Sequence, residues 1–137
     1  MSAALPLAAG DRLPELRRTL RAADLVAYAG ATWDWHRLHY DQAFASSRAL
    51  PAPIVDGQML GALLAEHVQD ALGPRSRVVR MSFRFRTLVF ADEEVVVTGD
   101  VTAVEPSDDG HRVTVTHSIQ APGGTAIKDA VTVAEVR

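Results

Sequence analysis

The sequence predicts an α+β fold in which an antiparallel sheet of about five strands wraps around one long central helix. Residues 57–72 carry apolar side chains at helical spacing with small residues between them, which is typical of a helix enclosed by other elements. After Pro74 apolar side chains recur at every second position, and four such segments follow, separated mostly by short turns. Because the long helix and the strands are segregated along the chain, the pattern favours the α+β class.

Length and composition narrow the possibilities. A chain of 137 residues is long enough for one domain with a sizeable core. We expect residues 15–137 to form this domain and residues 1–14 to form a flexible tail. The first ten residues contain no lysine or arginine and are interrupted by proline, unlike a secretory signal. No apolar run approaches the roughly 18 residues that a membrane span needs, so a soluble, cytoplasmic protein without a membrane partner is expected.

Charge and cysteine content exclude further classes. The formal net charge of -3 argues against a nucleic-acid partner, which would require a basic face. The chain has no cysteine, so it forms no disulfide and performs no thiolate chemistry, which fits a reducing compartment.

Two shorter elements are predicted at the start of the domain. Residues 15–20 are expected to form an edge strand. Residues 21–29 are expected to form a helix, since they are good helix formers with apolar side chains on one face. Thr19 or a neighbour would cap this helix, and Gly30 would end it.

The chain then approaches the central helix. Asp41 is expected to begin a short helical turn, after which two prolines force an extended run. Asp56 is well placed to cap residues 57–72, because its carboxylate can accept hydrogen bonds from unpaired backbone N–H groups of the first turn. Gly73 would end the helix.

The strands after the helix follow from alternation. Apolar side chains from Val79 to Phe85 alternate with polar ones, which predicts a half-exposed strand. The four predicted segments are residues 79–86, 95–104, 113–119 and 130–136.

Chemically useful side chains concentrate in residues 32–41, which hold both tryptophans and two of the five histidines. Asp34 and His39 are separated by a spacing that fits neither one helical turn nor an even strand step, so a loop is expected to bring them together. A carboxylate and an imidazole beside aromatic walls suit proton transfer. The alternative is a polar loop with two buried tryptophans, in which Asp34 accepts backbone hydrogen bonds and His39 is a packed imidazole.

This stretch resembles the signature of the MaoC-like, (R)-specific enoyl-CoA hydratases, Gly-Asp-x-Asn-Pro-aliphatic-His followed by an acidic residue. Asp34, Leu38 and His39 match that signature. His36 and Arg37 replace its Asn and Pro, and the sequence gives no reason for the arginine.

A second block supports the resemblance. Residues 53–60, Pro-Ile-Val-Asp-Gly-Gln-Met-Leu, resemble the family's (Ile/Val)-(Ala/Val)-His-Gly-Met-Leu at the family's distance downstream, with Asp56 in place of the His. The resemblance extends from about Leu20 to the C-terminus. It implies a hot-dog fold and hydration of a trans-2-enoyl thioester to an (R)-3-hydroxyacyl thioester, or the reverse dehydration.

The resemblance also implies catalytic roles. Asp34 and His39 would hold one water molecule on one face of the double bond and share the proton transfers. The backbone N–H of Gly57, at the positive end of the central helix, would stabilise the enolate-like oxygen, unless Gly57 is a simple turn glycine. Asp56 either only caps the helix or is itself a catalytic base.

Further residues are candidates for substrate binding. His36 would orient the site by a hydrogen bond, and Trp33 and Asp56 would border the substrate. Arg84 and Arg86 could meet the phosphates of coenzyme A, although such a stripe is commonly only the solvated face of a strand.

No metal site and no cofactor are predicted. His36, His39 and Asp34 resemble a metal-ligand set, but no other residue in the sequence completes it. The coenzyme A or acyl carrier would be part of the substrate.

Two other functions stay open. An acyl-CoA thioesterase of the same fold would use Glu66 on the central helix, or Asp56. The second possible function is that of a weakly active or structural subunit of a heteromeric MaoC-like hydratase. The resemblance implies this because the family contains paired chains of which only one is active.

Assembly is predicted from the edges of the sheet. Unpaired edge strands need partners, and Val95–Val97 and Val131–Val136 are apolar enough to be such edges. The resemblance implies edge-to-edge pairing with active sites near the interface. We therefore expect a homodimer, or a heteromer with another hot-dog chain.

Overall fold

One curled antiparallel sheet lies along a long helix, as the sequence predicts. The computed structural model describes residues 7–137. The strands lie in the order β1-β3-β4-β5-β2, and every neighbouring pair is antiparallel. The elements are β1 (Leu16–Leu20), α1 (Ala22–Thr32), the 3₁₀ turn η1 (Arg37–His39), α2 (Gln42–Ser47), α3 (Gly57–Leu72), β2 (Ser76–Ser82), β3 (Glu93–Ser107), β4 (Gly110–Ala121) and β5 (Gly124–Val136).

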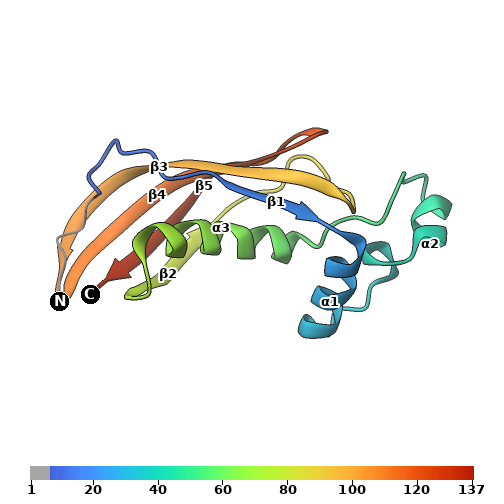
Figure 1. Cartoon of the computed structure of the whole chain (residues 1–137), viewed down its shortest axis with the longest axis horizontal. Coiled ribbons are helices and arrows are strands. Elements are labelled where there is room, and N and C mark those ends of the chain that lie inside the picture. Colours follow the sequence, from blue (N-terminus) through green and yellow to red (C-terminus); the bar gives the residue numbers. More distant parts are fainter. Residues whose placement is uncertain (1–6) are drawn as a thin grey trace.

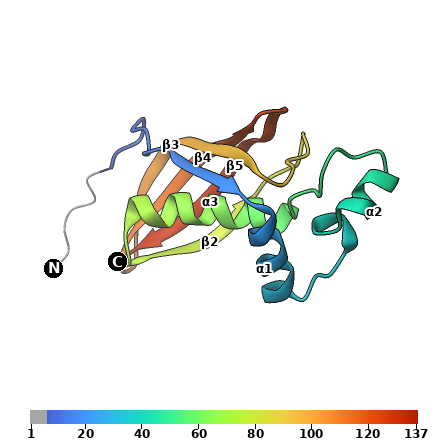
Figure 2. The same ribbon diagram turned by 45° about the vertical axis from the view of Figure 1, so that its right-hand side comes forward.

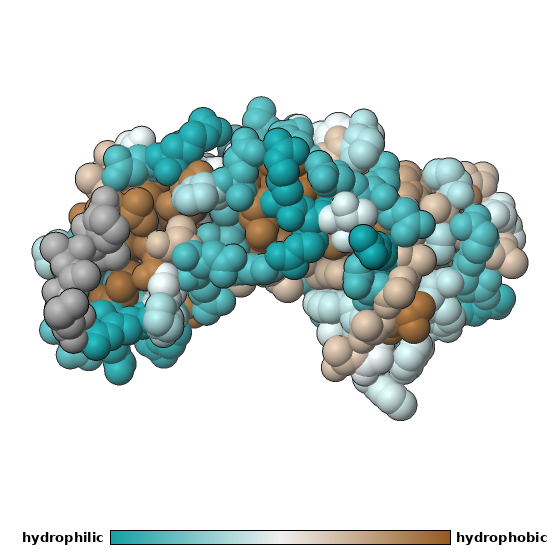
Figure 3. All heavy atoms as spheres, in the orientation of Figure 1, coloured by the Kyte–Doolittle hydropathy of each residue, from teal (hydrophilic) through white to brown (hydrophobic). Residues whose placement is uncertain are grey.

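The helices lie at two places relative to the sheet. Helix α3 runs along the inner side of the curled sheet, and α1 and α2 lie beyond the end of the sheet where α3 begins (Figures 1 and 2). In the space-filling view the surface is hollowed between the body of the sheet and the projecting α1 end (Figure 3). No helix among residues 7–137 is long and apolar enough to cross a membrane.

Helix α3 has the predicted bounds but is not enclosed on all sides. The Oδ1 atom of Asp56 accepts the Gln58 backbone N–H at 2.9 Å and caps the helix. Gly73 ends it with a φ of 89°, a conformation that favours glycine. Gln58, Ala62 and Gln69 are exposed, because the single sheet covers only one face of the helix. The residues buried on the other face are Leu60, Gly61, Leu63, Leu64, His67 and Val68.

Helix α1 begins and ends differently from the prediction. Its N-cap residue is Arg21, whose backbone N–H donates to Asp24 at 2.9 Å, whereas Thr19 belongs to β1. Gly30 lies inside the helix. The helix ends at Trp33, which adopts a left-handed φ of 58°, a conformation that residues other than glycine rarely adopt.

Strand β2 is shorter than predicted, and its alternation is interrupted. The register with β5 shifts between Val78 and Arg80, so that Val79 forms a bulge and is exposed instead of facing the core. The strand ends at Ser82. Phe85 makes only an isolated bridge to β5, and its side chain is 58% exposed.

The two segments predicted as unpaired edges lie inside the sheet. Val95–Val97 belongs to β3, which pairs with β1 and β4, and Val131–Val136 belongs to β5, which pairs with β2 and β4. Their apolar character reflects central strands rather than free edges. The edges are β1 and β2.

The chain ahead of β1 packs against the sheet. The backbone N–H groups of Gly10 and Leu13 donate to carbonyls of β3 at 2.7 and 2.9 Å, and Leu13 is buried. Ordered contacts therefore begin within the segment predicted to be a flexible tail, residues 1–14, because Leu13 contributes to the core. Residues 1–6 lie outside the described part of the chain.

A buried histidine pair connects α3 to the sheet. His67 Nε2 lies 2.9 Å from the Pro14 carbonyl oxygen, the two Nδ1 atoms of His67 and His117 lie 3.1 Å apart, and His117 Nε2 lies 2.8 Å from Thr132 Oγ1. A carbonyl only accepts, so His67 donates through Nε2 and accepts from His117 through Nδ1. His117 in turn accepts from the Thr132 hydroxyl. With both rings neutral every ring nitrogen is paired, whereas two protonated rings would set two Nδ1–H groups against each other.

Burial lowers the pKa of both rings. The side chain of His117 is 1% exposed, and desolvation, with a smaller effect of His67, lowers its pKa to about 4. Desolvation also lowers the pKa of His67, against the opposing effects of its hydrogen bond to Pro14 and the charge of Asp70. The pair is therefore neutral at neutral pH.

Candidate active site

Three ionisable side chains converge at the N-terminal end of α3. Asp34, His39 and Asp56 each place one oxygen or nitrogen within 4.8 Å of the others. They line a tight cavity that is nowhere wide enough for a water molecule. The remaining lining residues are Leu25, Tyr28, Ala29 and Met59.

The end of α1 positions Asp34. The left-handed conformation of Trp33 turns the chain, and the Asp34 backbone N–H then donates to the Ala29 carbonyl at 3.0 Å. The carboxylate of Asp34 accepts a long hydrogen bond of 3.4 Å from the His36 backbone N–H. Asp34 thus enters the cavity from a helix terminus rather than from a free loop.

The turn η1 positions His39 against the chain before α3. His39 Nδ1 lies 2.8 Å from the Ile54 carbonyl oxygen, and the Ile54 backbone N–H donates to the Leu38 carbonyl at 2.9 Å. Because a carbonyl oxygen only accepts, Nδ1 carries a proton and Nε2 is the nitrogen free for chemistry. The segment before α3 is itself fixed by a hydrogen bond from the Val55 backbone N–H to Val89 at 2.8 Å.

His36 supports the site from outside the cavity. Its Nδ1 accepts the Leu38 backbone N–H at 3.2 Å and so caps η1, the turn that carries His39. His36 is exposed and lies outside the group formed by Asp34, His39 and Asp56. The sequence suggested His36 as the third ligand beside Asp34 and His39, but in the structure the third residue is Asp56. The orienting role predicted for His36 is consistent with this cap.

Arg37 is explained by its neighbours. Its guanidinium donates to Asp41 at 2.9 and 3.0 Å and lies 4.6 Å above the ring of Phe44. A backbone hydrogen bond from Phe44, followed by the hydrogen bond from Arg37, lowers the pKa of Asp41. Arg37 therefore fastens η1 to α2.

The tryptophans do not form walls of the cavity and are not buried. Trp33 is 80% exposed and packs edge-on against Trp35, and Trp35 packs edge-on against Tyr40. These aromatic side chains pack around the chain that leads into η1, and the Tyr40 hydroxyl donates to the Trp35 backbone carbonyl at 3.0 Å. The aromatic residue that does line the cavity is Tyr28.

Tyr28 was not among the predicted site residues. Burial, and secondly the negative charge of Asp56, raise the pKa of its phenol. The sequence signal that could have identified Tyr28 is its position on the same helical face as Leu25 and Ala29, which also line the cavity.

Gly57 lies at the first position of α3, where backbone N–H groups lack helical partners. The ring of Phe85 covers it so closely that a Cβ atom on Gly57 would lie 2.3 Å from Phe85 Cζ. A larger residue at position 57 would therefore displace the exposed ring of Phe85.

The other predicted residues lie away from the cavity. Arg84 and Arg86 are exposed and follow the end of β2. Glu66 lies farther along α3 and pairs with Arg18 at 2.6 Å. None of these three residues lines the cavity at Asp34 and His39.

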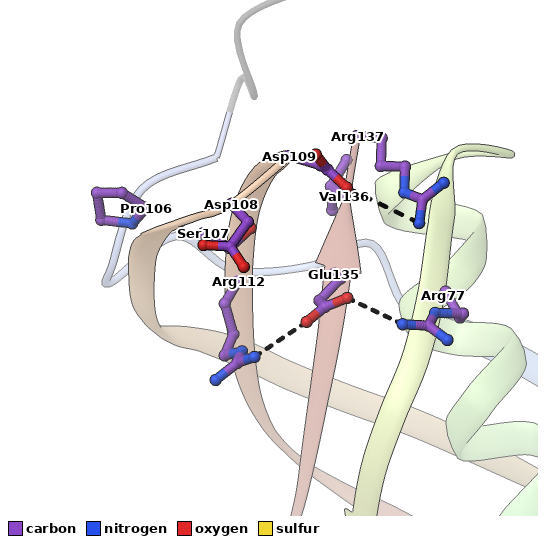
Figure 4. Close-up of a pocket in the computed structure, with 9 residues that line it drawn as sticks. All are labelled: Arg77, Pro106, Ser107, Asp108, Asp109, Arg112, Glu135, Val136 and Arg137. Atoms are coloured by element: carbon purple, nitrogen blue, oxygen red, sulfur yellow. Dashed lines mark hydrogen bonds and ion pairs between the residues drawn. The ribbon is translucent and has the colours of Figure 1, made fainter.

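A larger hollow of about 440 Å³ lies near the chain's C-terminus, at the turn between β3 and β4 (Figure 4). Glu135 at its centre accepts hydrogen bonds from Arg112 and Arg77, which lower its pKa. These charged groups neutralise one another in solvent, so the hollow offers no buried group for chemistry.

Comparison with known proteins identifies the family. A family model described as "MaoC like domain" matches residues 7–121. The (R)-specific enoyl-CoA hydratase of Aeromonas caviae is 34% identical over 110 residues, which cover 80% of this chain and 81% of that protein.

Solved structures agree with this assignment. The (R)-hydratase of A. caviae involved in PHA biosynthesis matches with a TM-score of 0.86 and 31% identity, over 98% of this chain and 100% of that one. A chain of the ChsH1-ChsH2 complex from Mycobacterium tuberculosis matches with a TM-score of 0.85 and 25% identity, over 94% and 98% of the two chains. These matches confirm the predicted hot-dog fold, and this chain belongs to the MaoC-like domain family.

Proposed function

We propose that this protein hydrates a trans-2-enoyl thioester to an (R)-3-hydroxyacyl thioester, or catalyses the reverse dehydration. The observation that carries the proposal is the convergence of Asp34 with the free Nε2 of His39 beside the N-terminus of α3. The likeness to a named (R)-specific enoyl-CoA hydratase over four fifths of the chain supports the same reaction.

The proposed reaction uses these groups in two successive proton transfers. Asp34 and His39 hold a water molecule, and its oxygen adds to C3 while one of its protons passes to His39 Nε2. The proton is then delivered to C2, so that the elements of water are added across the double bond. The backbone N–H of Gly57 and the helix dipole of α3 stabilise the negative charge on the thioester oxygen.

An apolar groove next to the cavity supports an acyl substrate. The groove, of about 360 Å³, lies between α1, the end of β1 and α3, and shares Tyr28 and Met59 with the cavity. We place the acyl chain there. Arg84 and Arg86, both exposed, stay candidates for the phosphates of coenzyme A.

The thioesterase alternative is distinguishable by one residue. Glu66 is held by Arg18 and lies outside the cavity, so Glu66→Gln is expected to leave hydration within about twofold of the wild type. Hydration and release of free coenzyme A thiol should be followed separately with crotonyl-CoA and with a bulkier enoyl-CoA. Thiol release that disappears in Glu66→Gln, without hydration in the wild type, would replace our proposal by a thioesterase.

A heteromeric assembly has its own supporting observation. The cavity of the single chain has no room for water, and a chain similar to this one comes from a complex of two different named proteins. A partner chain would open and complete the site. In that case the purified homomer would hydrate weakly and gain activity on mixing with its partner, whereas full activity of a stable monomer would contradict any assembly.

We place the interface of this assembly on the β2 edge. Both edge strands carry arginines in ion pairs, Arg17 and Arg18 on β1 and Arg77 on β2, but β2 also exposes the apolar Val79 at its bulge. Val79→Glu is expected to convert a dimer to monomers in light scattering. The matched change Val26→Glu, at an exposed valine of α1, should leave the dimer intact. A dimer that survives Val79→Glu would move the interface elsewhere.

A further inference from the structure

Asp56 contains a buried oxygen that the capping of α3 does not explain. The residue is 8% exposed, and its Oδ1 accepts the Gln58 backbone N–H at 2.9 Å. Its other oxygen, Oδ2, is buried and has no hydrogen-bond partner among residues 7–137. Burying a carboxylate oxygen without a hydrogen-bond partner costs free energy, so we looked for a group in the cavity that could pair with Asp56 Oδ2 during the reaction.

His39 is the group that faces this oxygen. Its Nδ1 is committed to the Ile54 carbonyl at 2.8 Å, and its Nε2 lies 3.9 Å from Asp56 Oδ2. Both side chains are anchored independently, Asp56 by the first turn of α3 and His39 by the chain before it. A proton on Nε2 would place an imidazolium directly opposite a fixed carboxylate.

The other groups around the imidazole add to this effect. Asp34 is a second carboxylate in the same cavity, and the phenol of Tyr28, whose pKa is raised, stays neutral. The ring of His36 lies 6.0 Å away, measured between ring centroids, on the exposed side. Asp34 and Asp56 both lie beside His39 in this cavity, so a proton on Nε2 would meet two carboxylates.

We propose that Asp56 is a positioning residue for His39, which stabilises the imidazolium formed when Nε2 takes up a proton. This inference rests on the proposed hydration. The proton that leaves the attacking water resides on Nε2 until it passes to C2, and Asp56 stays ionised throughout. Asp56 acts through His39, on the Nε2 side of the ring, while the Ile54 carbonyl holds Nδ1.

A bound metal ion would be the other way to satisfy Asp56. Two ligands of one tetrahedral ion lie about 3.4 Å apart when each is about 2.1 Å from the ion. The separation of 3.9 Å between His39 Nε2 and Asp56 Oδ2 is longer, and it suits an ion pair that tightens on protonation. Treatment with a chelator should therefore leave both the activity and the ring signals of His39 unchanged.

The kinetic test is Asp56→Asn, which keeps a capping oxygen for Gln58 but removes the charge. We expect kcat to fall by about 10- to 100-fold with KM within about twofold, because only the charged intermediate state loses its partner. The thermal midpoint should change little. The matched control is Asp109→Asn, the same change at an exposed position in the turn between β3 and β4, which should keep the wild-type kcat.

The second test does not depend on activity. Nitrogen NMR signals of the histidine rings, with His39 assigned from His39→Gln, report how much imidazolium is present at each pH. We expect a larger fraction of His39 imidazolium in the wild type than in Asp56→Asn at the same pH, because the variant lacks the carboxylate opposite Nε2. Identical titration of His39 in the two proteins would overturn the inference. A wild type that hydrates no enoyl thioester, alone or with a partner, would instead refute the proposed function while this titration still decides whether Asp56 and His39 act as a pair.

Discussion

Asp34→Asn and His39→Ala are each expected to lower the turnover of enoyl thioester hydration by about 10² to 10⁴, which is the usual contribution of general acid–base catalysis. Asn keeps the shape of Asp34 but cannot accept a proton, and Ala removes the free Nε2 of His39. The two groups act on one water molecule, so the double variant should be little worse than the worse single variant.

Matched controls lie at the opposite end of the sheet. Asp109→Asn and His111→Ala make the same chemical changes in exposed positions around the turn between β3 and β4. They should retain wild-type turnover. Near-wild-type turnover in Asp34→Asn or in His39→Ala, measured at saturating substrate, would remove that residue from the catalytic role.

Acid is expected to destabilise the protein through the buried histidine pair. The ordinary pKa of 6.5 falls to about 4 for His117 in the folded state, so the unfolded chain binds more protons between these two values. This stabilising contribution is complete above pH 6.5 and is lost as the pH falls toward 4. It amounts to roughly 3 kcal/mol of unfolding free energy for His117 alone. Asp41 and Glu135, whose pKa values are lowered, add their losses at still lower pH.

Urea unfolding at a series of pH values, followed by tryptophan fluorescence, measures this effect. The variant His117→Asn keeps an N–H donor toward His67 but does not titrate, so its unfolding free energy should be lower at pH 7 and should depend less on pH between 6.5 and 4. The control His111→Gln, at an exposed position of the same strand, should keep the wild-type dependence. An unchanged free energy of unfolding between pH 6.5 and 4 in the wild type would contradict the neutral hydrogen-bonded pair.

The sequence predicted those helices and strands whose bounds are set by residues within or next to the element itself. Helix α3 has its predicted bounds because Asp56 and Gly73 form a cap and a stop at the ends of an apolar periodic run. The bulge at Val79 was not predictable, because it is set by pairing with β5 and the local pattern stays alternating. The left-handed conformation of Trp33 was equally hidden, since nothing in a tryptophan favours that conformation.

The sequence predicted the pair Asp34 and His39 of the candidate site, but it did not predict that Asp56 lies beside them. Motif spacing identified Asp34 and His39, which lie in one short stretch. Asp56 comes beside them only through long-range backbone hydrogen bonds that dock the chain before α3, such as the bond between Ile54 and Leu38. The sequence predicted that Asp56 caps α3, and the structure confirms this cap. The distance between Asp56 and His39, however, depends on how the chain before α3 docks against η1, which the local sequence does not show.

The most direct measurement of the central claim is the identity of the product formed from crotonyl-CoA. Mass spectrometry combined with chiral analysis distinguishes the addition of water from cleavage of the thioester. We predict an intact thioester that has gained one water molecule and has the (R) configuration at C3, formed by the wild type and nearly absent with Asp34→Asn. Free acid together with coenzyme A, or product formation that is unaffected by Asp34→Asn, would contradict the proposed function.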